Sequence, residues 1–160
     1  MSAKDQAIVD RTRAIPLIQF AISYLKDAAE ALKYRELLGE PAYLIAMLER
    51  RPAIEDAAKI ARVANELWLC RGDLGAELGI RAMAETVYRF SEKVRDFPAP
   101  VFMAGQVLEH MTGHPTPTRS EISTIYDSLA RGYEGLVLSD ETAIGRFPVE
   151  SCQAAALFKG

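Results

Sequence analysis

The sequence has few of the residues that mark disulfide-bonded, zinc-binding or nucleic-acid-binding proteins. Its two cysteines, Cys70 and Cys152, lie in apolar contexts without C-x-x-C spacing, which argues against a disulfide scaffold and a structural zinc site. The two histidines, His110 and His114, are not expected at strand ends. The net charge is −3 and the basic residues are scattered among acidic ones, so we expect neither nucleic acid nor a membrane as partner.

A secretion signal and a membrane-spanning run are also missing from the sequence pattern. Residues 1–6 lack a basic segment followed by an apolar one. The longest apolar stretch, Ile15 to Leu25, is interrupted by Gln19 and is too short to cross a bilayer. Together with the unpaired thiols, this pattern predicts a cytoplasmic protein. With 49% apolar residues, the chain is expected to form one domain over residues 1–160.

Short apolar runs alternate with longer amphipathic stretches, which is the pattern of α/β proteins with parallel strands. We expect five strands, at Leu17–Ser23, Tyr43–Glu49, Glu66–Cys70, Pro100–Gly105 and Gly135–Ser139. We expect helices at Lys26–Leu38, Ile54–Val63, Gly79–Val94, Arg119–Ala130 and Pro148–Phe158. Thr118 and Glu121 are spaced like a capping box before the fourth of these helices.

Two acidic residues follow neighbouring strands of this sheet. Glu49 ends the second strand, and Asp73 lies in Arg71–Gly75, where the glycines predict a flexible turn that brings backbone N–H groups close to an anion. Since the carboxyl ends of parallel strands meet at one edge, the two carboxylates suit a hard divalent cation held by oxygen ligands plus water and substrate. The alternative is that each carboxylate caps the following helix or pairs with Arg50 or Arg71.

Four motifs follow one another along the chain, namely Arg71-Gly72-Asp73-Leu74-Gly75, Gln106-Val107-Leu108-Glu109, Pro117-Thr118-Arg119-Ser120-Glu121 and Ser139-Asp140-Glu141-Thr142-Ala143. In order and spacing they resemble the catalytic barrel of pyruvate kinase. Phe20–Ala28 resembles the fourth barrel strand of that family, and Met47-Leu48-Glu49 stands at its Lys-Ile-Glu motif. The resemblance implies a partial TIM-type (β/α) barrel, similar to strands four to eight of a glycolytic phosphotransferase without its lid and C-terminal domains.

The resemblance implies that the cation-binding half of the family site is retained. Glu49 and Asp73 match the two carboxylates by which the family holds its divalent ion, Mg²⁺ or Mn²⁺. Gly72 and Asp73 match the positions whose backbone N–H groups meet the substrate carboxylate. The implied ligands are a divalent cation and a small oxoacid of the pyruvate or phosphoenolpyruvate class.

The same comparison implies that the phosphoryl-transfer half is lost. Met47 stands where the family has a lysine that neutralises the migrating phosphoryl group, and a thioether supplies no positive charge. Gly105 stands at a threonine of the family that binds the substrate carboxylate, and Asp140 replaces a glycine. Removing one charge-stabilising group typically costs ~10² to 10³ in rate. We therefore expect no catalytic residue for phosphoryl transfer.

The expected function is binding of a divalent cation and an oxoacid without phosphoryl transfer. Two alternatives stay open, namely a metal-dependent lyase or decarboxylase acting on a pyruvate-like substrate, and a non-catalytic structural or regulatory partner. Five parallel strands leave edges at Leu17–Ser23 and Gly135–Ser139. We expect a homo-oligomer, a subunit that supplies the missing strands, or a rearranged segment Ala3 to Ala14 to cover them.

Overall fold

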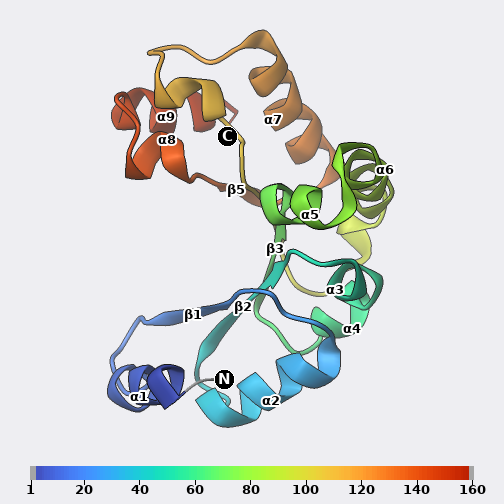
Figure 1. The fold of residues 1–160 in the computed structure, drawn as a ribbon, viewed down its shortest axis with the longest axis vertical. Coiled ribbons are helices and arrows are strands. Elements are labelled where there is room, and N and C mark those ends of the chain that lie inside the picture. The colour runs from blue at the N-terminus through green and yellow to red at the C-terminus, as the bar shows by residue number, and fades with distance from the viewer. Residues whose placement is uncertain (1–2, 159–160) are drawn as a thin grey trace.

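The computed structural model describes residues 3–158 as one parallel β-sheet with helices packed against it (Figure 1). The strands are β1 Gln19–Ile22, β2 Tyr43–Leu48, β3 Glu66–Cys70, β4 Val101–Ala104 and β5 Gly135–Val137. Each strand pairs in parallel with the next one along the chain, in the order β1-β2-β3-β4-β5. This order is that of successive strands in a (β/α) barrel. The predicted α/β class and five parallel strands are confirmed.

The helices that connect the strands follow the predicted pattern with three differences. They are α1 Ala3–Thr12, α2 Ala28–Leu38, α3 Arg51–Glu55, α4 Ala57–Ile60, α5 Arg71–Leu78, α6 Ile80–Ser91, α7 Arg119–Arg131, α8 Asp140–Ala143 and α9 Pro148–Ala155, with 3-10 turns η1 Val94–Asp96 and η2 Glu109–Thr112. First, neither α1 nor the short helix α8 was predicted. Second, the helix expected over Ile54–Val63 is divided into α3 and α4. Third, Arg71–Gly75 is not a flexible turn, because helix α5 begins directly at Arg71.

The division between α3 and α4 falls at Asp56, whose side chain contacts a residue that is distant in the sequence. Its carboxylate accepts hydrogen bonds from the backbone N–H of Ala28, at 2.9 Å, and from Lys59 Nζ, at 2.7 Å. Asp56 thereby satisfies a donor at the start of α2, where Asp27 caps the N–H of Glu30. Apolar spacing within residues 54–63 carries no information about this contact.

The two faces of the sheet differ in their surroundings. Alternate residues of the central strands join the helices in the main hydrophobic core, namely Leu44, Ala46, Leu48, Leu67, Leu69, Val101 and Met103. The residues between them lie on the other face, where Ile45 is buried and Met47, Trp68 and Phe102 are half-buried. Trp68 therefore lies outside the main core.

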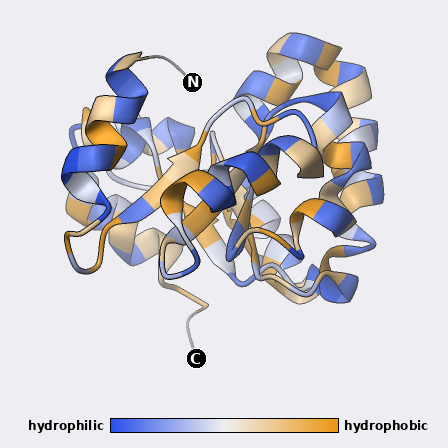
Figure 2. Cartoon of the chain, turned by 90° about the horizontal axis from the view of Figure 1, so that it is seen from below, coloured by the Kyte–Doolittle hydropathy of each residue, from blue (hydrophilic) through white to orange (hydrophobic). Residues whose placement is uncertain are grey.

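The helices in Figure 2 carry both hydrophobic and hydrophilic residues, as expected for helices that cover one face of a sheet. Over residues 3–158, none of them combines the length and the apolar composition that a membrane crossing needs.

Candidate functional site

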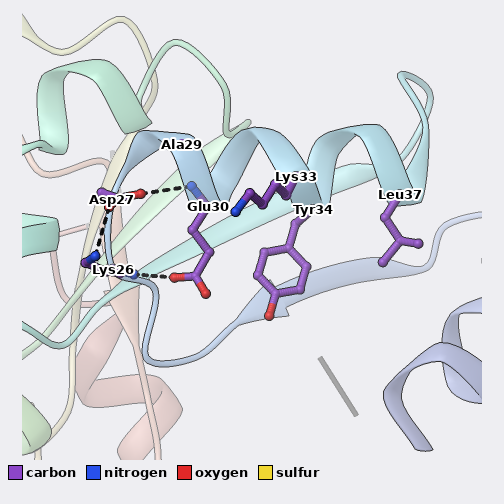
Figure 3. A pocket seen from close by; sticks show the side chains of 7 residues that line it. All are labelled: Lys26, Asp27, Ala29, Glu30, Lys33, Tyr34 and Leu37. Carbon is purple, nitrogen blue, oxygen red and sulfur yellow. Dashed lines mark hydrogen bonds and ion pairs between the residues drawn. The ribbon is translucent and has the colours of Figure 1, made fainter. Parts of the chain in front are cut away.

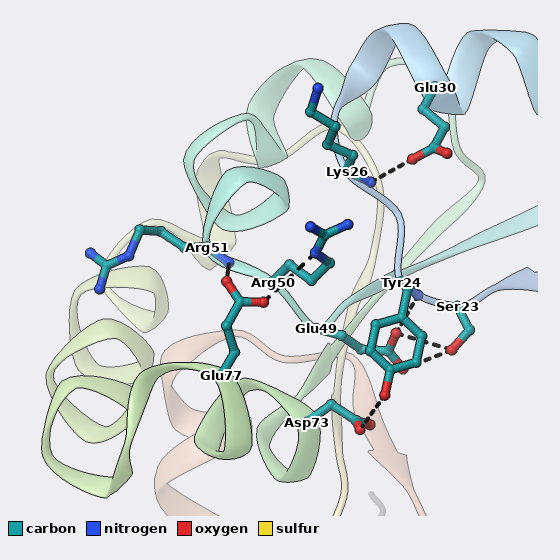
Figure 4. Close-up of polar contacts among 9 residues, drawn as sticks. All are labelled: Ser23, Tyr24, Lys26, Glu30, Glu49, Arg50, Arg51, Asp73 and Glu77. Carbon is teal, nitrogen blue, oxygen red and sulfur yellow. Dashed lines mark hydrogen bonds and ion pairs between the residues drawn. The ribbon is translucent and has the colours of Figure 1, made fainter.

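Glu49, directly after β2, is a buried carboxylate held by two donor groups (Figure 4). Its side chain is only 2% exposed. The Ser23 hydroxyl lies 3.1 and 3.0 Å from its two carboxylate oxygens, and the backbone N–H of Tyr24 donates to Oε2. Within residues 3–158 no Lys, Arg or His side chain forms an ion pair with Glu49. An anionic carboxylate is thus fixed in place without a cationic partner.

Asp73 lies in the first turn of α5 and is exposed to solvent. Helix α5 directly follows β3, which pairs with β2, the strand that precedes Glu49. Its Oδ1 accepts a hydrogen bond of 3.0 Å from the phenolic hydroxyl of Tyr24. This hydrogen bond and the Asp73 charge raise the pKa of Tyr24, so the phenol remains a donor at neutral pH. Like Glu49, Asp73 forms no ion pair with the residues described.

Tyr24 connects the two predicted carboxylates, and sequence analysis did not find it. Its backbone contacts Glu49 and its side chain contacts Asp73 (Figure 4). The residue has a φ of +55°, in the left-handed region that residues with a side chain rarely adopt. No spacing in the sequence predicts this conformation. The only indication that Tyr24 could belong to the site was its position directly after Ser23, the end of the first predicted strand.

The arginines expected to neutralise these carboxylates have other partners. Arg50 pairs with Glu77, with Nε and Oε2 3.7 Å apart, and that glutamate also accepts the backbone N–H of Arg51 at 3.1 Å. The guanidinium of Arg71 donates to the carbonyl oxygens of Gly105, at 2.9 Å, and Gln106, at 2.8 Å. Burial lowers the pKa of Arg71. The pairing alternative is therefore wrong for Glu49 and Asp73.

Gly72 and Gly105 meet where β4 ends beside the start of α5. The backbone N–H groups of Gly72 and Asp73 belong to the first turn of α5, where they have no acceptor within the helix, and Cys70 provides no side-chain cap. Gly105 has a φ of +77°, and a Cβ built there would lie 3.3 Å from Gly72 N. The absence of a side chain at Gly105 thus lets the end of β4 approach the amino end of α5 closely.

Met47 lies on the same strand face as Glu49 and pairs in register with Trp68. A thioether on this face brings no positive charge to the carboxylates. Cys70 ends β3 beside the same group, and burial, followed by the charges of Glu49 and Asp73, raises the pKa of its thiol to about 12. The site therefore contains two carboxylates and a neutral thiol.

Glu49 and Asp73 do not belong to a larger cluster of metal ligands. Over residues 3–158, three or more His, Cys, Asp or Glu side chains nowhere gather closely enough to hold a metal ion. His110 and His114 stack on each other, with ring centroids 3.8 Å apart, and are exposed. A cation at the two carboxylates would need water or substrate oxygens to complete its coordination, as is usual for Mg²⁺.

A separate hollow of about 550 Å³ lies along helix α2 (Figure 3). It is lined by Lys26, Asp27, Ala29, Glu30, Lys33, Tyr34 and Leu37, and neither Glu49 nor Asp73 contributes to it. Two of its acidic side chains make local contacts, since Glu30 accepts the backbone N–H of Lys26 at 2.7 Å and Asp27 accepts that of Glu30. This hollow is thus unrelated to the carboxylate pair.

Comparison with known proteins identifies the family. The family model described as "Pyruvate kinase, barrel domain" matches residues 1–152. A pyruvate kinase of Agrobacterium vitis is 31% identical over 96% of this chain and 32% of its own length, and that of Thermotoga maritima is 31% identical over 82% and 29%. The plastidial pyruvate kinase 3 of Arabidopsis thaliana is 33% identical over 82% and 24%. The chain thus spans about a third or less of the length of these relatives. Because one of them is chloroplastic, the cytoplasmic location stays a prediction. On this match to the barrel domain, the chain belongs to the pyruvate kinase family.

Proposed function

We propose that this barrel segment binds a divalent cation through Glu49 and Asp73 and a small oxoacid at the backbone N–H groups of Gly72 and Asp73. The observation that carries the proposal is that both carboxylates lack an ion-pair partner among the described residues, although Glu49 is almost fully buried. A buried carboxylate is costly unless it is paired, hydrogen-bonded or bound to a metal. The Ser23 hydroxyl and the Tyr24 backbone N–H offset part of that cost at Glu49, and a cation would offset more.

The donor set fits Mg²⁺ or Mn²⁺. Both ions prefer oxygen ligands, and Mg²⁺ is usually held by one or two carboxylates while it keeps several waters. When bound, such an ion neutralises negative charge on the oxygens of an oxoacid. The amino end of α5 adds N–H groups and a partial positive charge next to Asp73, which favours an anionic group there.

Phosphoryl transfer is not part of the proposed function. Met47 cannot neutralise a migrating phosphoryl group, and no lysine or arginine of the described chain forms an ion pair with Glu49 or Asp73 in its place. The positive φ of Gly105 further disfavours the threonine that the family has at this position.

Isothermal titration calorimetry tests the cation site. We expect the native chain to bind Mn²⁺ in the presence of oxalate, a stable dicarboxylate analogue of an enolate, and Asp73→Ala to lose this binding. Asp140→Ala is the matched control, because Asp140 is an exposed carboxylate in the first turn of α8, after the last strand. Absent binding to the native chain, or equal binding to Asp73→Ala, would show that the site does not exist.

A coupled assay with phosphoenolpyruvate and ADP tests the absence of phosphoryl transfer. We expect no turnover above background from the native chain. Met47→Lys returns a positive charge to the face that carries Glu49 and is the variant in which any residual turnover should rise. Turnover by the native chain that Met47→Lys leaves unchanged would contradict the role assigned to this position.

We further propose that the sheet is completed by another polypeptide, either a second copy of this chain or a subunit that supplies barrel strands. Within residues 3–158, β1 and β5 are the edge strands, and apolar side chains such as Met47, Trp68 and Phe102 remain half-buried on the face away from the core. Light scattering at micromolar concentration, with and without a co-expressed neighbouring gene, tests this. A monomer under both conditions would contradict it.

A further inference from the structure

Tyr24 contacts both carboxylates of the proposed cation site, one through its backbone and the other through its side chain. Its backbone N–H donates to Glu49 Oε2, and its phenolic oxygen lies 3.0 Å from Asp73 Oδ1. The residue therefore links the two carboxylates, with its backbone at Glu49 and its phenol at Asp73 (Figure 4). A cation bound by both carboxylates must approach an oxygen of each to within about 2 Å, which places it in the same space.

The phenol is not needed to orient Glu49. The Ser23 hydroxyl and the Tyr24 backbone N–H already hold that carboxylate, and neither donor depends on the Tyr24 ring. At Asp73, in contrast, the phenol donates to Oδ1. The hydroxyl thus competes with a cation for Oδ1 of Asp73.

The Tyr24 side chain is free to leave this position. It is 59% exposed, so rotation into solvent removes little apolar surface from contact with the protein. The backbone of Tyr24, with its φ of +55° and its hydrogen bond to Glu49, need not move when the side chain rotates.

We infer that Tyr24 is a displaceable latch, which fills the space between Glu49 and Asp73 and must rotate away before a divalent cation binds to both. This inference rests on the proposed cation site and adds a residue that sets its affinity. An outer-sphere donor that only oriented Asp73 would have the opposite effect, because its removal typically weakens metal binding by about 10- to 100-fold.

Mn²⁺ binding to the full chain, measured by electron paramagnetic resonance, distinguishes these roles. Tyr24→Phe removes the hydroxyl and is expected to bind Mn²⁺ about three- to tenfold more tightly than the native chain, the size of one hydrogen bond. Tyr43→Phe is the matched control, because its phenol donates to Glu66 at 2.9 Å and does not contact the carboxylate pair. The control is expected to leave the affinity unchanged.

A second readout follows the ring itself. Mg²⁺ is expected to change the near-ultraviolet absorbance of the native chain, and to have no such effect on Tyr24→Phe, because the phenol leaves Asp73 when the cation binds. If circular dichroism shows Tyr24→Phe to be misfolded, Tyr24→Leu replaces it, with the same tightening expected.

The outcomes separate the latch from the cation site. Unchanged or weaker Mn²⁺ binding by Tyr24→Phe, when the native chain binds and Asp73→Asn does not, would overturn the latch and leave the cation site standing. If Tyr24→Phe binds Mn²⁺ and the native chain does not, the result would support a latch whose hydroxyl prevents cation binding in the native chain. If no variant binds Mn²⁺, both the proposed function and the latch are wrong.

Discussion

Arg35 Nη2 donates a hydrogen bond of 2.6 Å to Asn65 Oδ1 across 30 residues of sequence. The guanidinium, whose residue is 8% exposed, also donates to the carbonyl oxygens of Ala42, at 2.5 Å, and Val63, at 3.0 Å. The same Asn65 oxygen accepts the backbone N–H of Leu44 at 2.8 Å. An arginine that interrupts the apolar spacing of α2 therefore fastens the loops before β2 and β3 to that helix.

Replacing this guanidinium should destabilise the fold. Arg35→Met keeps the aliphatic stem but leaves buried carbonyl oxygens without donors, and we expect the free energy of unfolding to fall by about 2–4 kcal/mol. Urea denaturation measures the change, and Arg62→Met, at an exposed position, is the control. A loss at Arg35 no larger than at Arg62 would show that these hydrogen bonds contribute little.

Gly105→Thr, which restores the residue of the family, should also be destabilising. The left-handed backbone at Gly105 costs about 1–2 kcal/mol for a residue with a Cβ, and that atom would lie 3.3 Å from Gly72 N. Gly113→Thr is the control, because Gly113 has a negative φ and open space around its Cα. Equal unfolding midpoints for the two variants would indicate that the backbone at residue 105 adjusts freely.

The two thiols should differ strongly in reactivity at pH 8. The pKa of Cys70 is raised to about 12, mainly by burial, so its reactive thiolate is scarce, whereas Cys152 is exposed. We expect one fast reaction with Ellman's reagent, which Cys152→Ser abolishes, and a second only after unfolding. Fast labelling of Cys70 in the native chain would contradict its burial.

The same thiol predicts the direction of an alkaline effect on stability. Its folded pKa of about 12 lies above the ordinary value of 9.0, so the folded chain favours the neutral form. This contribution is complete below pH 9 and is lost as the pH rises from 9 towards 12, because only the unfolded chain ionises there. Cys70→Ala should reduce the slope of unfolding free energy against pH in this range, and an unchanged slope would assign it to other groups.

Helix α7 should depend on its amino-terminal capping box. Thr118 Oγ1 accepts the N–H of Glu121 at 3.1 Å, and the Glu121 carboxylate accepts the N–H of Thr118 at 2.7 Å. Thr118→Ala is expected to cost about 1 kcal/mol of unfolding free energy, whereas Thr118→Ser keeps the acceptor and should cost less. Thermal or urea unfolding of the three chains checks this order, and equal losses would argue against the cap.

Features that depend on local spacing could be predicted from the sequence. The capping box of Thr118 and Glu121 is present as expected, and the five strands lie within the predicted ranges. The motif containing Asp73 gave the family correctly, although the expected turn is the first turn of a helix.

Features that depend on contacts between distant residues could not be predicted in this way. The helix divides at Asp56, which accepts the backbone N–H of Ala28, and Glu49 and Asp73 are linked by Tyr24, whose backbone is left-handed. The alternation of apolar residues predicts neither feature. It indicates which face of a helix or strand is buried, but not which distant residue a polar side chain contacts. The roles of Glu49, Asp73 and Gly72 stay predictions until binding is measured.

The consecutive strand order has a consequence for how this sheet forms. Paired residues are separated by between 21 and 34 positions, from Ile45 with Glu66 to Leu67 with Val101. Each strand pairs with the strand that precedes or follows it in the sequence, so no pairing requires closure of a loop longer than this separation. During synthesis the sheet can therefore grow one strand at a time from its amino end, and each newly added strand becomes the template for the next.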